Sequence, residues 1–554
     1  MPAQADLETL RSRLAYTPRE LKFGTSGRRG KVVDLTQLEV YLNARAELEY
    51  LQSLTPAEGG IRRGEEFFFA RDLRPSSSSF VAEQGGRGEI AQAIVAAIRD
   101  AGMRPVNLGC IPTPALTYYA LAQAKGSMMV TGSHIPFDRN GFKTNTSRGE
   151  LLKQHEAPIG ERVRLLRERL YGEPYEPSLF DAHGFFKAGS QPLPPETDQA
   201  RAAYIARYTE FFRGAPLTGK RLLVYQHSAV GRDLLVEILE RLGAEAIPAG
   251  RSDTFVPIDT ENIDAEQVAA IQALADHAAA VHGRIDAVVS ADGDSDRPLL
   301  LGLAPSGKVR FFSGDLVGMI VAGYLAADAV VVPISCNDAI DRGTLAAVLE
   351  PKTRIGSPYV IAGMEQARAR GKRRVCGWEA NGGFLTGSDI ELGGAVLKAL
   401  PTRDAMLPIL ATLVAARDAG LGLPALFERL PKRFSRAALL RQFPRPAALE
   451  ILSRFTPRSA QPDASEVAAI RARLAGFFSP DAGFGTVAAL DYTDGVRILF
   501  GNGEVVHLRP SGNADEFRIY AVADTQARAD DIAALGIAEP DGILRRMERT
   551  LVAR

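Results

Sequence analysis

One layout recurs three times along this chain: an apolar strand, a polar loop, an amphipathic helix and a second short strand. The copies begin at Glu65, Arg221 and Asp328. Strands that alternate with helices of this length predict right-handed βαβ units and mixed, mainly parallel sheets. The copies are only weakly similar and unevenly spaced. The sequence therefore predicts three related α/β domains rather than a solenoid.

The end of the chain has a different pattern. Residues 493–524 alternate apolar and polar side chains around Asn-Gly turns, which predicts an antiparallel sheet in a C-terminal α+β domain. At roughly 150 residues per domain, 554 residues suggest about three to five domains. Residues 150–197 contain several prolines and glycines and are interpreted as an inserted loop and helix. The expected domains are 1–196, which includes that insertion, 197–312, 313–440 and 441–554.

Charge and cysteine content limit the binding partners and the cellular location that the sequence suggests. Lys plus Arg and Asp plus Glu are equal, at 66 each, so no basic excess indicates nucleic acid or a membrane surface. The apolar run at residues 316–327 is too short to cross a bilayer and is interpreted as a buried helix. Three scattered cysteines and no signal-like N-terminus favour a reducing cytoplasm. We expect a cytoplasmic monomer or dimer.

A cluster of aspartates follows a buried strand in "RIDAVVSADGDSDRPLLL". Asp292, Asp294 and Asp296 fall where ligands collect in open α/β sheets, at the carboxyl end of a strand. Three carboxylates at alternate positions converge on one divalent ion only if the backbone curves, and Gly293 permits that curve.

The same loop has two other interpretations. An EF-hand needs Gly at its sixth position and Glu at its twelfth, where this chain has Arg297 and Leu303, so it is excluded. A solvated acidic loop stays open. Arg297 argues against it, because a cation beside metal-binding carboxylates suits a shared phosphoryl group.

A second stretch, "MMVTGSHIPFDRNGFKTN", ends an apolar run on Ser133 and His134, which we expect to be exposed. Taken alone, it fits an ordinary turn at least as well as a site, because Gly132, Pro136 and the Asn140-Gly141 pair are turn formers.

Two more loops have ligand-binding character. In "CGWEANGGFLTG", Glu379 and Asn381 could bind vicinal hydroxyls of a sugar, although this stretch taken alone fits a hairpin turn without a ligand better. In "HLRPSGNADEFRIY", a fork of donors and a nest of backbone amides suit a phosphate. The candidate residues there are Arg509, Ser511, Gly512, Asn513 and Arg518, of which the last could also be a solvated strand residue.

Together these stretches resemble the α-D-phosphohexomutase superfamily, the phosphoglucomutases and phosphomannomutases. The segments that carry the resemblance span nearly the whole chain in the family's order: "FGTSGRRG", "TGSHIP", "NGFK", "DGDSDR", "GWEANGG" and "RPSGNADEFR".

The resemblance implies a role for each matched residue. Ser133 would be the phosphorylated serine and would bind Mg²⁺ together with Asp292, Asp294 and Asp296. The catalytic set would be Ser133, Lys143, Arg29, His134 and Arg297. Lys143 would act as a general acid/base, with a lowered pKa, or only as a phosphate contact, and His134 would position the phosphate or hold its loop. Glu379 and Asn381 would bind sugar hydroxyls, and Arg509, Ser511, Gly512, Asn513 and Arg518 the distal phosphate.

The implied activity is a mutase that interconverts hexose 1-phosphate and hexose 6-phosphate through a phosphoserine and a hexose 1,6-bisphosphate. One Mg²⁺ per active site and hexose 1,6-bisphosphate as activator would be needed. The open alternatives are a phosphoglucosamine or N-acetylglucosamine-phosphate mutase, a metal-dependent sugar phosphatase and a non-catalytic phosphosugar-binding protein. The chain departs from the family pattern at Gly132, Ile135, Asn513-Ala514 and Ser357, the last replacing a frequent histidine.

Overall fold

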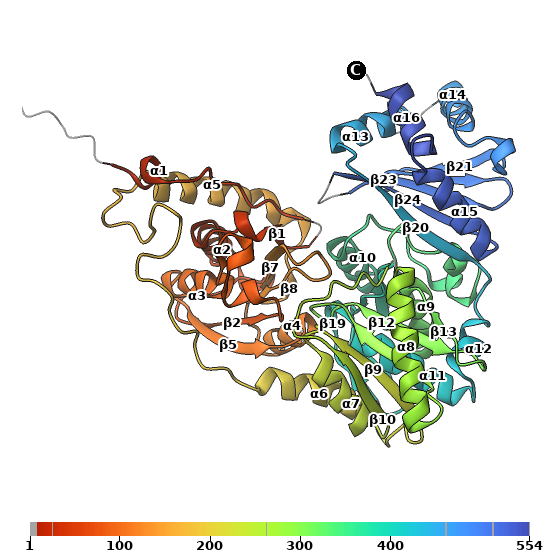
Figure 1. The fold of residues 1–554 in the computed structure, drawn as a ribbon, viewed down its shortest axis with the longest axis horizontal. Coiled ribbons are helices and arrows are strands. Elements are labelled where there is room, and N and C mark those ends of the chain that lie inside the picture. The colour runs from red at the N-terminus through yellow and green to blue at the C-terminus, as the bar shows by residue number, and fades with distance from the viewer. Residues whose placement is uncertain (1–7, 25, 262, 460–462, 512–514, 553–554) are drawn as a thin grey trace, which may run out of the picture.

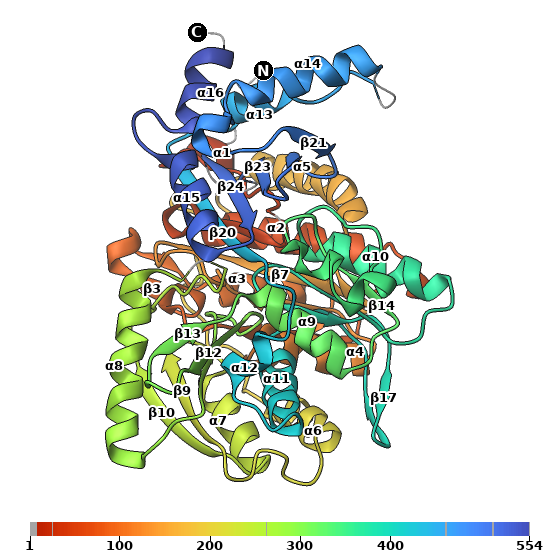
Figure 2. The ribbon, with the colours of Figure 1, turned by 90° about the vertical axis from the view of Figure 1, so that its right-hand side faces the viewer.

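The computed structural model describes residues 8–24, 26–261, 263–459, 463–511 and 515–552. Its strands form four main sheets that follow one another along the chain, each covered by helices (Figures 1 and 2). The expected multi-domain α/β architecture with mixed sheets is confirmed.

The first sheet has the order β1-β7-β6-β2-β5, with the short β8 added to β7. Its strand β2 is buried on both faces, since Phe67 and Phe69 pack in one core cluster and Phe68 and Ala70 pack in another. The elements are β1 (Arg28–Lys31), α2 (Gln37–Leu51), β2 (Glu66–Arg71), α3 (Ile90–Asp100), β5 (Arg104–Cys110), α4 (Thr113–Ala122), β6 (Ser127–Val130), β7 (Arg139–Thr146) and β8 (Gly149–Glu150).

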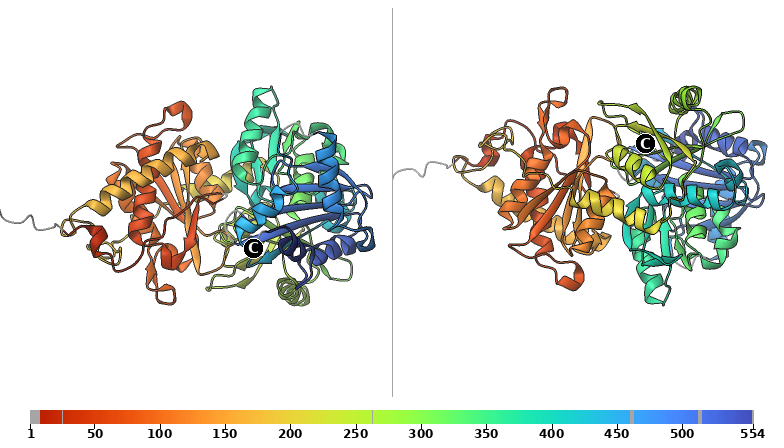
Figure 3. Two further views of the ribbon diagram at one scale, coloured as in Figure 1. Left: turned by 90° about the horizontal axis from the view of Figure 1, so that it is seen from above. Right: turned by 90° about the horizontal axis from the view of Figure 1, so that it is seen from below.

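The segment expected to be an insertion is part of the first core. Its helix α5 (Glu156–Gly172) packs on α2 through buried residues such as Ile159 and Leu166. The chain then continues to α6 (Gln199–Phe211), which lies between the N-terminal body and the rest of the molecule (Figure 3).

The second sheet has the order β10-β9-β11-β12-β13 and contains the second expected βαβ unit. The pairs β9–β10 and β9–β11 are parallel, and the remaining pairs are antiparallel. The elements are β9 (Arg221–His227), α7 (Arg232–Arg241), β10 (Glu245–Arg251), α8 (Ala265–His282), β11 (Ala287–Ala291), β12 (Pro298–Leu303) and β13 (Val309–Phe311).

The third sheet, β14-β15-β16-β19, differs from its expected layout. The helix expected after β14 (Ala329–Val331) is replaced by two 3-10 helices, 338–341 and 344–348, because Gly343 interrupts the segment. The other elements are α9 (Gly314–Tyr324), α10 (Ser357–Ala369), β15 (Val375–Trp378), β16 (Phe384–Thr386), the hairpin β17 (Ile390–Leu392) and β18 (Ala395–Leu397), β19 (Leu400–Asp404), α11 (Met406–Asp418) and α12 (Leu423–Phe427).

Helix α9 contains most of the apolar run at residues 316–327 and is buried, as expected. Within the described parts of the chain, no helix is both long and apolar enough to cross a membrane.

The fourth sheet is antiparallel, as expected, with the order β20-β24-β23-β22-β21. Its first strand begins at Phe434, so we propose that the last domain starts there rather than at residue 441. The elements are β20 (Phe434–Arg441), α13 (Arg445–Ser453), α14 (Ala464–Ala475), β21 (Val487–Asp491), β22 (Val496–Phe500), β23 (Val505–Pro510), β24 (Glu516–Ala523), α15 (Gln526–Ile537) and α16 (Ile543–Leu551).

Each candidate loop occupies the same position in its own sheet. The loops connect strands that are adjacent and antiparallel: β6 to β7, β11 to β12, β15 to β16, and β23 to β24. The fold therefore presents the four loops as turns between paired strands.

Candidate active site

The loop after β6 holds Ser133 in a rare backbone conformation. Ser133 has a φ of +54°, which is unfavourable for a residue with a side chain. Its amide donates to Thr131 Oγ1 at 2.7 Å, and Thr131 in turn donates to Asp72 at 2.8 Å. The expectation that this serine is exposed is wrong, since Ser133 is fully buried beneath the surrounding loops, and His134 is half-buried.

An arginine that the sequence did not single out fastens this loop. Arg74 donates to the backbone oxygens of Ser133 at 2.9 Å and of Pro136 at 2.8 Å. A Cβ at Gly132 would lie 2.7 Å from Cζ of Arg74. The departure to glycine at position 132 therefore makes room for the guanidinium.

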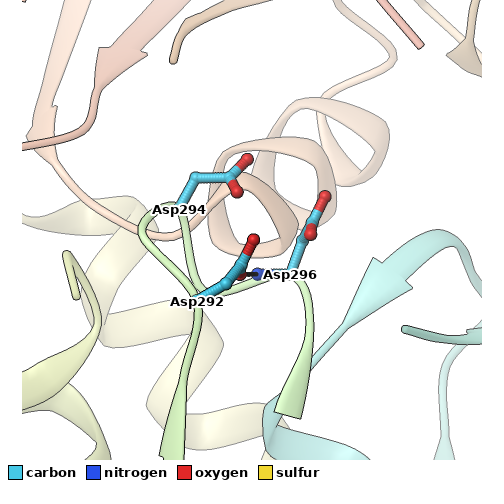
Figure 4. A group of neighbouring side chains, drawn as sticks. All are labelled: Asp292, Asp294 and Asp296. Atoms are coloured by element: carbon cyan, nitrogen blue, oxygen red, sulfur yellow. Dashed lines mark hydrogen bonds between the residues drawn. The ribbon is translucent and has the colours of Figure 1, made fainter. Parts of the chain in front are cut away.

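The three aspartates form the group expected of a cation site. One ligand oxygen from each of Asp292, Asp294 and Asp296 lies within 4.8 Å of the others, and the carboxylates stand on a single turn (Figure 4). Asp294 Oδ1 and Asp296 Oδ1 are buried and accept no hydrogen bond from the described residues. Buried carboxylate oxygens without donors fit a divalent cation.

The turn achieves this shape differently from the expectation. The left-handed residue is Ser295, with a φ of +55°, and not Gly293. Gly293 is needed for close approach, because a Cβ there would lie 2.6 Å from the carbonyl oxygen of Ser133. Asp292 Oδ1 closes the turn by accepting from the amides of Asp296 and Arg297 at 3.1 and 3.2 Å.

The metal loop meets the serine loop directly. Ser133 Oγ donates to Asp292 Oδ2 at 2.7 Å. Lys143 Nζ lies 2.6 Å from Asp294 Oδ2 and 2.8 Å from Asp296 Oδ2, and all of these groups are buried. Thr113, at the start of α4, donates to Asp294 Oδ2 at 2.6 Å and was not anticipated.

The carboxylates differ in their affinity for protons. Burial and the neighbouring Asp294 and Asp296 raise the pKa of Asp292 well above its usual range. Burial also acts on Asp294, but Lys143 and Thr113 hold its pKa below the ordinary value. Arg403 and Lys143 outweigh burial at Asp296 and lower its pKa further.

Two arginines and a histidine complete this end of the site. Burial and the charge of Arg297 lower the pKa of Arg29 to about 10. Arg29 Nε and Arg297 Nε are buried without a hydrogen-bond acceptor among the described residues. Burial, Arg297 and Arg29 lower the pKa of His134 well below its usual range, so this imidazole is neutral. Arg297 Nε does lie 3.6 Å from Asp296 Oδ1, as an ion pair. The cluster thus offers an anion two cationic Nε donors that have no acceptor at hydrogen-bond distance.

The sugar loop is joined to the metal loop through an unanticipated residue, Arg403. Its guanidinium donates to Asp296 Oδ2 at 2.9 Å and to Glu379 Oε2 at 3.0 Å. Asn381 Oδ1 accepts from the amide of Gly383 at 3.0 Å, and its backbone oxygen accepts from Thr260. Glu379 and Asn381 are both buried in the turn between β15 and β16.

The phosphate loop is placed by contacts of its arginine. Arg509 Nε donates to Asp494 Oδ1 at 3.2 Å, while Asp494 Oδ2 accepts from the amide of Ile355 at 3.0 Å. Arg509 faces Arg518 across the β23–β24 pair, and Ser511 is buried. The expected ligands Gly512 and Asn513 lie outside the described residues.

Ser357, at the start of α10, contacts the first sheet. Its hydroxyl donates to Glu150 Oε2 at 2.7 Å, and Glu150 Oε1 accepts from Thr402 at 2.5 Å. This serine therefore joins two parts of the chain where the family often has a histidine.

Protein-family models match three parts of the chain. Residues 20–169, 313–434 and 458–535 match the phosphoglucomutase/phosphomannomutase alpha/beta/alpha domain I, alpha/beta/alpha domain III and C-terminal domain.

Similar proteins extend this match over nearly the full length. A phosphomannomutase of Sinorhizobium fredii is 38% identical over 93% of this chain and 98% of its own. A phosphomannomutase of Salmonella muenchen is 36% identical over 92% and 94%. A crystal structure of a phosphoglucomutase/phosphomannomutase family protein from Burkholderia thailandensis has a TM-score of 0.64 at 17% identity, covering 97% of this chain and 99% of that one, which shows the shared fold.

The fold and these matches define the class of protein: a phosphohexomutase, which is an isomerase. The chain belongs to the α-D-phosphohexomutase superfamily.

Proposed function

We propose that this mutase interconverts hexose 1-phosphate and hexose 6-phosphate, with mannose phosphates as its principal substrates. The names of the two full-length relatives support the sugar class. The observation that supports the chemistry is the 2.7 Å contact between Ser133 Oγ and Asp292 Oδ2, within a group of carboxylates that retains free oxygens.

In this proposal Ser133 carries the phosphoryl group. The free oxygens of Asp294 and Asp296, together with Asp292 and a phosphoserine oxygen, would hold one Mg²⁺. When bound, the ion would draw charge from the phosphorus. Arg29 and Arg297 would neutralise the remaining phosphoryl charge, because both guanidinium groups have Nε donors without hydrogen-bond acceptors.

The transfer requires a proton acceptor on the sugar side. As the sugar hydroxyl attacks, the bond from phosphorus to Ser133 Oγ breaks and a bond to the sugar oxygen forms. We assign the hydroxyl proton to Lys143 in its neutral amine form, because the ammonium that pairs with Asp294 and Asp296 has no lone pair to accept a proton. The product, a hexose 1,6-bisphosphate, turns over and returns its other phosphoryl group to Ser133, and added bisphosphate would restore any dephosphorylated enzyme.

The remaining loops hold the substrate in both orientations. Glu379 and Asn381 would bind sugar hydroxyls, and His134, neutral in the folded protein, would position the phosphoryl group. The phosphate that is not being transferred would lie against Arg509, Ser511 and Arg518, with Gly512 and Asn513 adding to the cradle.

A substrate comparison tests this function. The 1-phosphates of mannose, glucose, glucosamine and N-acetylglucosamine would be assayed with Mg²⁺ and a trace of hexose 1,6-bisphosphate. We expect conversion of mannose and glucose phosphates, with mannose preferred. Turnover of amino-sugar phosphates alone would contradict the proposed mannose phosphate substrate. Release of free phosphate without isomerisation would indicate a phosphatase.

A further inference from the structure

Arg403 joins two loops that have separate roles in the proposed reaction. Its Nε and Nη2 lie 3.1 and 2.9 Å from Asp296 Oδ2, and its Nη1 lies 3.0 Å from Glu379 Oε2. The arginine is 2% exposed and both carboxylates are buried. A single rigid guanidinium thus fixes the distance between the metal loop and the sugar loop.

We propose that Arg403 is a positioning residue, which sets the carboxylate of Glu379 in register with the metal loop and thereby controls sugar discrimination. The inference rests on the proposed function, in which Glu379 binds a sugar hydroxyl. Arg403 itself needs no contact with the substrate.

The sugar loop is shaped around this side chain. A Cβ at Gly383 would lie 2.5 Å from Cδ and 2.6 Å from Cγ of Arg403. The second glycine of "ANGG" is therefore needed for the arginine to pass beneath the turn. No side-chain hydrogen bond or ion pair of Glu379 other than that with Arg403 occurs among the described residues.

The strand that carries Arg403 is itself anchored on both sides. Thr402 donates to Glu150 of the first sheet at 2.5 Å. Asp404 accepts hydrogen bonds from Tyr204 and Tyr208 of α6. Three consecutive residues at the end of β19 therefore bind three different parts of the chain, and the guanidinium has a fixed point from which to act.

Lysine could not replace this arginine. A lysine has one ammonium group and no planar fork, so it cannot bind Asp296 through two nitrogens and reach Glu379 with a third. Arg403→Lys would keep the charge beside Asp296 but leave Glu379 free to rotate.

The kinetic test compares Arg403→Lys, Glu379→Gln and the double variant with mannose 1-phosphate and glucose 1-phosphate. Loss of a charged hydrogen bond lowers kcat/KM by roughly ten- to a hundredfold. We expect both single variants to change the mannose-to-glucose ratio in the same direction, and the double variant to change it no further. An unchanged ratio in Arg403→Lys, or ratio changes that multiply, would overturn the proposal.

Tyr208→Phe is the matched control. It removes a hydrogen bond to Asp404 beside Arg403 but leaves the guanidinium contacts in place. We expect it to lower the melting temperature without altering the sugar ratio. A changed ratio in this variant would show that any loosening of β19 suffices and that Arg403 has no special role.

A second test needs no turnover and so separates this inference from the proposed function. Urea unfolding of Arg403→Lys, Glu379→Gln and the double variant measures whether the two residues act together. We expect the urea midpoint of the double variant to be no lower than that of the less stable single variant. Additive shifts would reject the coupling, whereas coupling in a protein without mutase activity would reject only the function.

Discussion

The hydroxyl of Ser133 lies 2.7 Å from a carboxylate oxygen of Asp292, although 159 residues separate them in the chain. The other oxygen of the same carboxylate accepts two backbone amides of its own turn. Asp292 therefore fixes the serine to the metal loop, and the proposed phosphoryl group would form beside the free oxygens of Asp294 and Asp296.

Ser133→Ala should abolish the phosphorylated form and nearly all turnover. Intact-mass measurement of the purified protein should show a fraction heavier by one phosphoryl group in the wild type and none in the variant. The lost hydrogen bond to buried Asp292 should cost about 1–3 kcal/mol of stability. The control is Ser290→Ala, because Ser290 is a buried serine that donates to a backbone oxygen outside the site. The protein with this substitution should still be phosphorylated at Ser133. Full activity of Ser133→Ala would refute the assignment.

Asp294→Asn should weaken binding of Mg²⁺ and nearly abolish turnover. Asp294 is fully buried, and it accepts hydrogen bonds from Thr113 and Lys143. The variant should thus also lose about 1–3 kcal/mol of stability. Titration calorimetry with Mg²⁺ and thermal unfolding with EDTA would separate the two effects. Exposed Asp253→Asn should change neither, and unchanged metal affinity in Asp294→Asn would contradict the site.

Glu379→Gln and Arg509→Ala should have different kinetic signatures. The distal cradle meets a phosphate in both half-reactions, so Arg509→Ala should lower kcat/KM for mannose and glucose phosphates by a similar factor. Glu379→Gln should change the ratio between the sugars, since a charged hydrogen bond to a hydroxyl is worth about 1.5–3 kcal/mol. Steady-state kinetics on both 1-phosphates would decide. The reverse pattern would mean that the two loops have exchanged roles.

Asp494→Asn should raise KM for every phosphosugar with less effect on kcat. Asp494 orients Arg509 with one oxygen and is itself held by the amide of Ile355 with the other. Loss of the carboxylate charge weakens the ion pair that orients the guanidinium of Arg509. The weakening is about 0.5–1.5 kcal/mol, which corresponds to a few-fold increase in KM. Asp530→Asn, on α15 and paired with Arg436 of β20, serves as the control. An unchanged KM would show that Arg509 needs no such support.

Glu261 should make stability depend on pH. Burial and the charge of Asp259 raise its pKa from 4.5 to about 7, and Glu379 adds to this increase. The positive charges of Arg518 and Arg297 oppose the increase but do not cancel it. Because the folded pKa is the higher one, its stabilising contribution is complete below about pH 4.5 and is lost as the pH rises through 7.

Glu261→Gln should therefore melt at a higher temperature than the wild type at pH 8, with the difference vanishing towards pH 4.5. Thermal unfolding across this range with EDTA and no substrate measures it, and exposed Glu266→Gln should follow the wild type. A constant difference at all pH values would contradict the raised pKa.

The sequence was sufficient to find the four loops because each is a contiguous segment with its own residue pattern. Their support came from elsewhere. Arg74 and Arg403 were not identified as residues that support the site, since their contacts form only when segments far apart in the sequence pack together. The burial of Ser133 has the same origin, because it depends on loops that local periodicity does not describe.

Local patterns also misjudged the segment at residues 338–348. Its apolar spacing resembled a helix, but Asn337 caps a 3-10 turn with its side chain, and Gly343 interrupts the segment. Short competing hydrogen bonds of this kind override periodicity over a few residues.

Arg403 also has a consequence for biosynthesis. Asp296 is synthesised 107 residues before Arg403, and Glu379 is synthesised 24 residues before it. Burying a carboxylate before its partner exists costs several kcal/mol. We therefore expect the sugar loop to stay hydrated during translation until β19 emerges, and the third sheet to close over Glu379 only after Arg403 has left the exit tunnel.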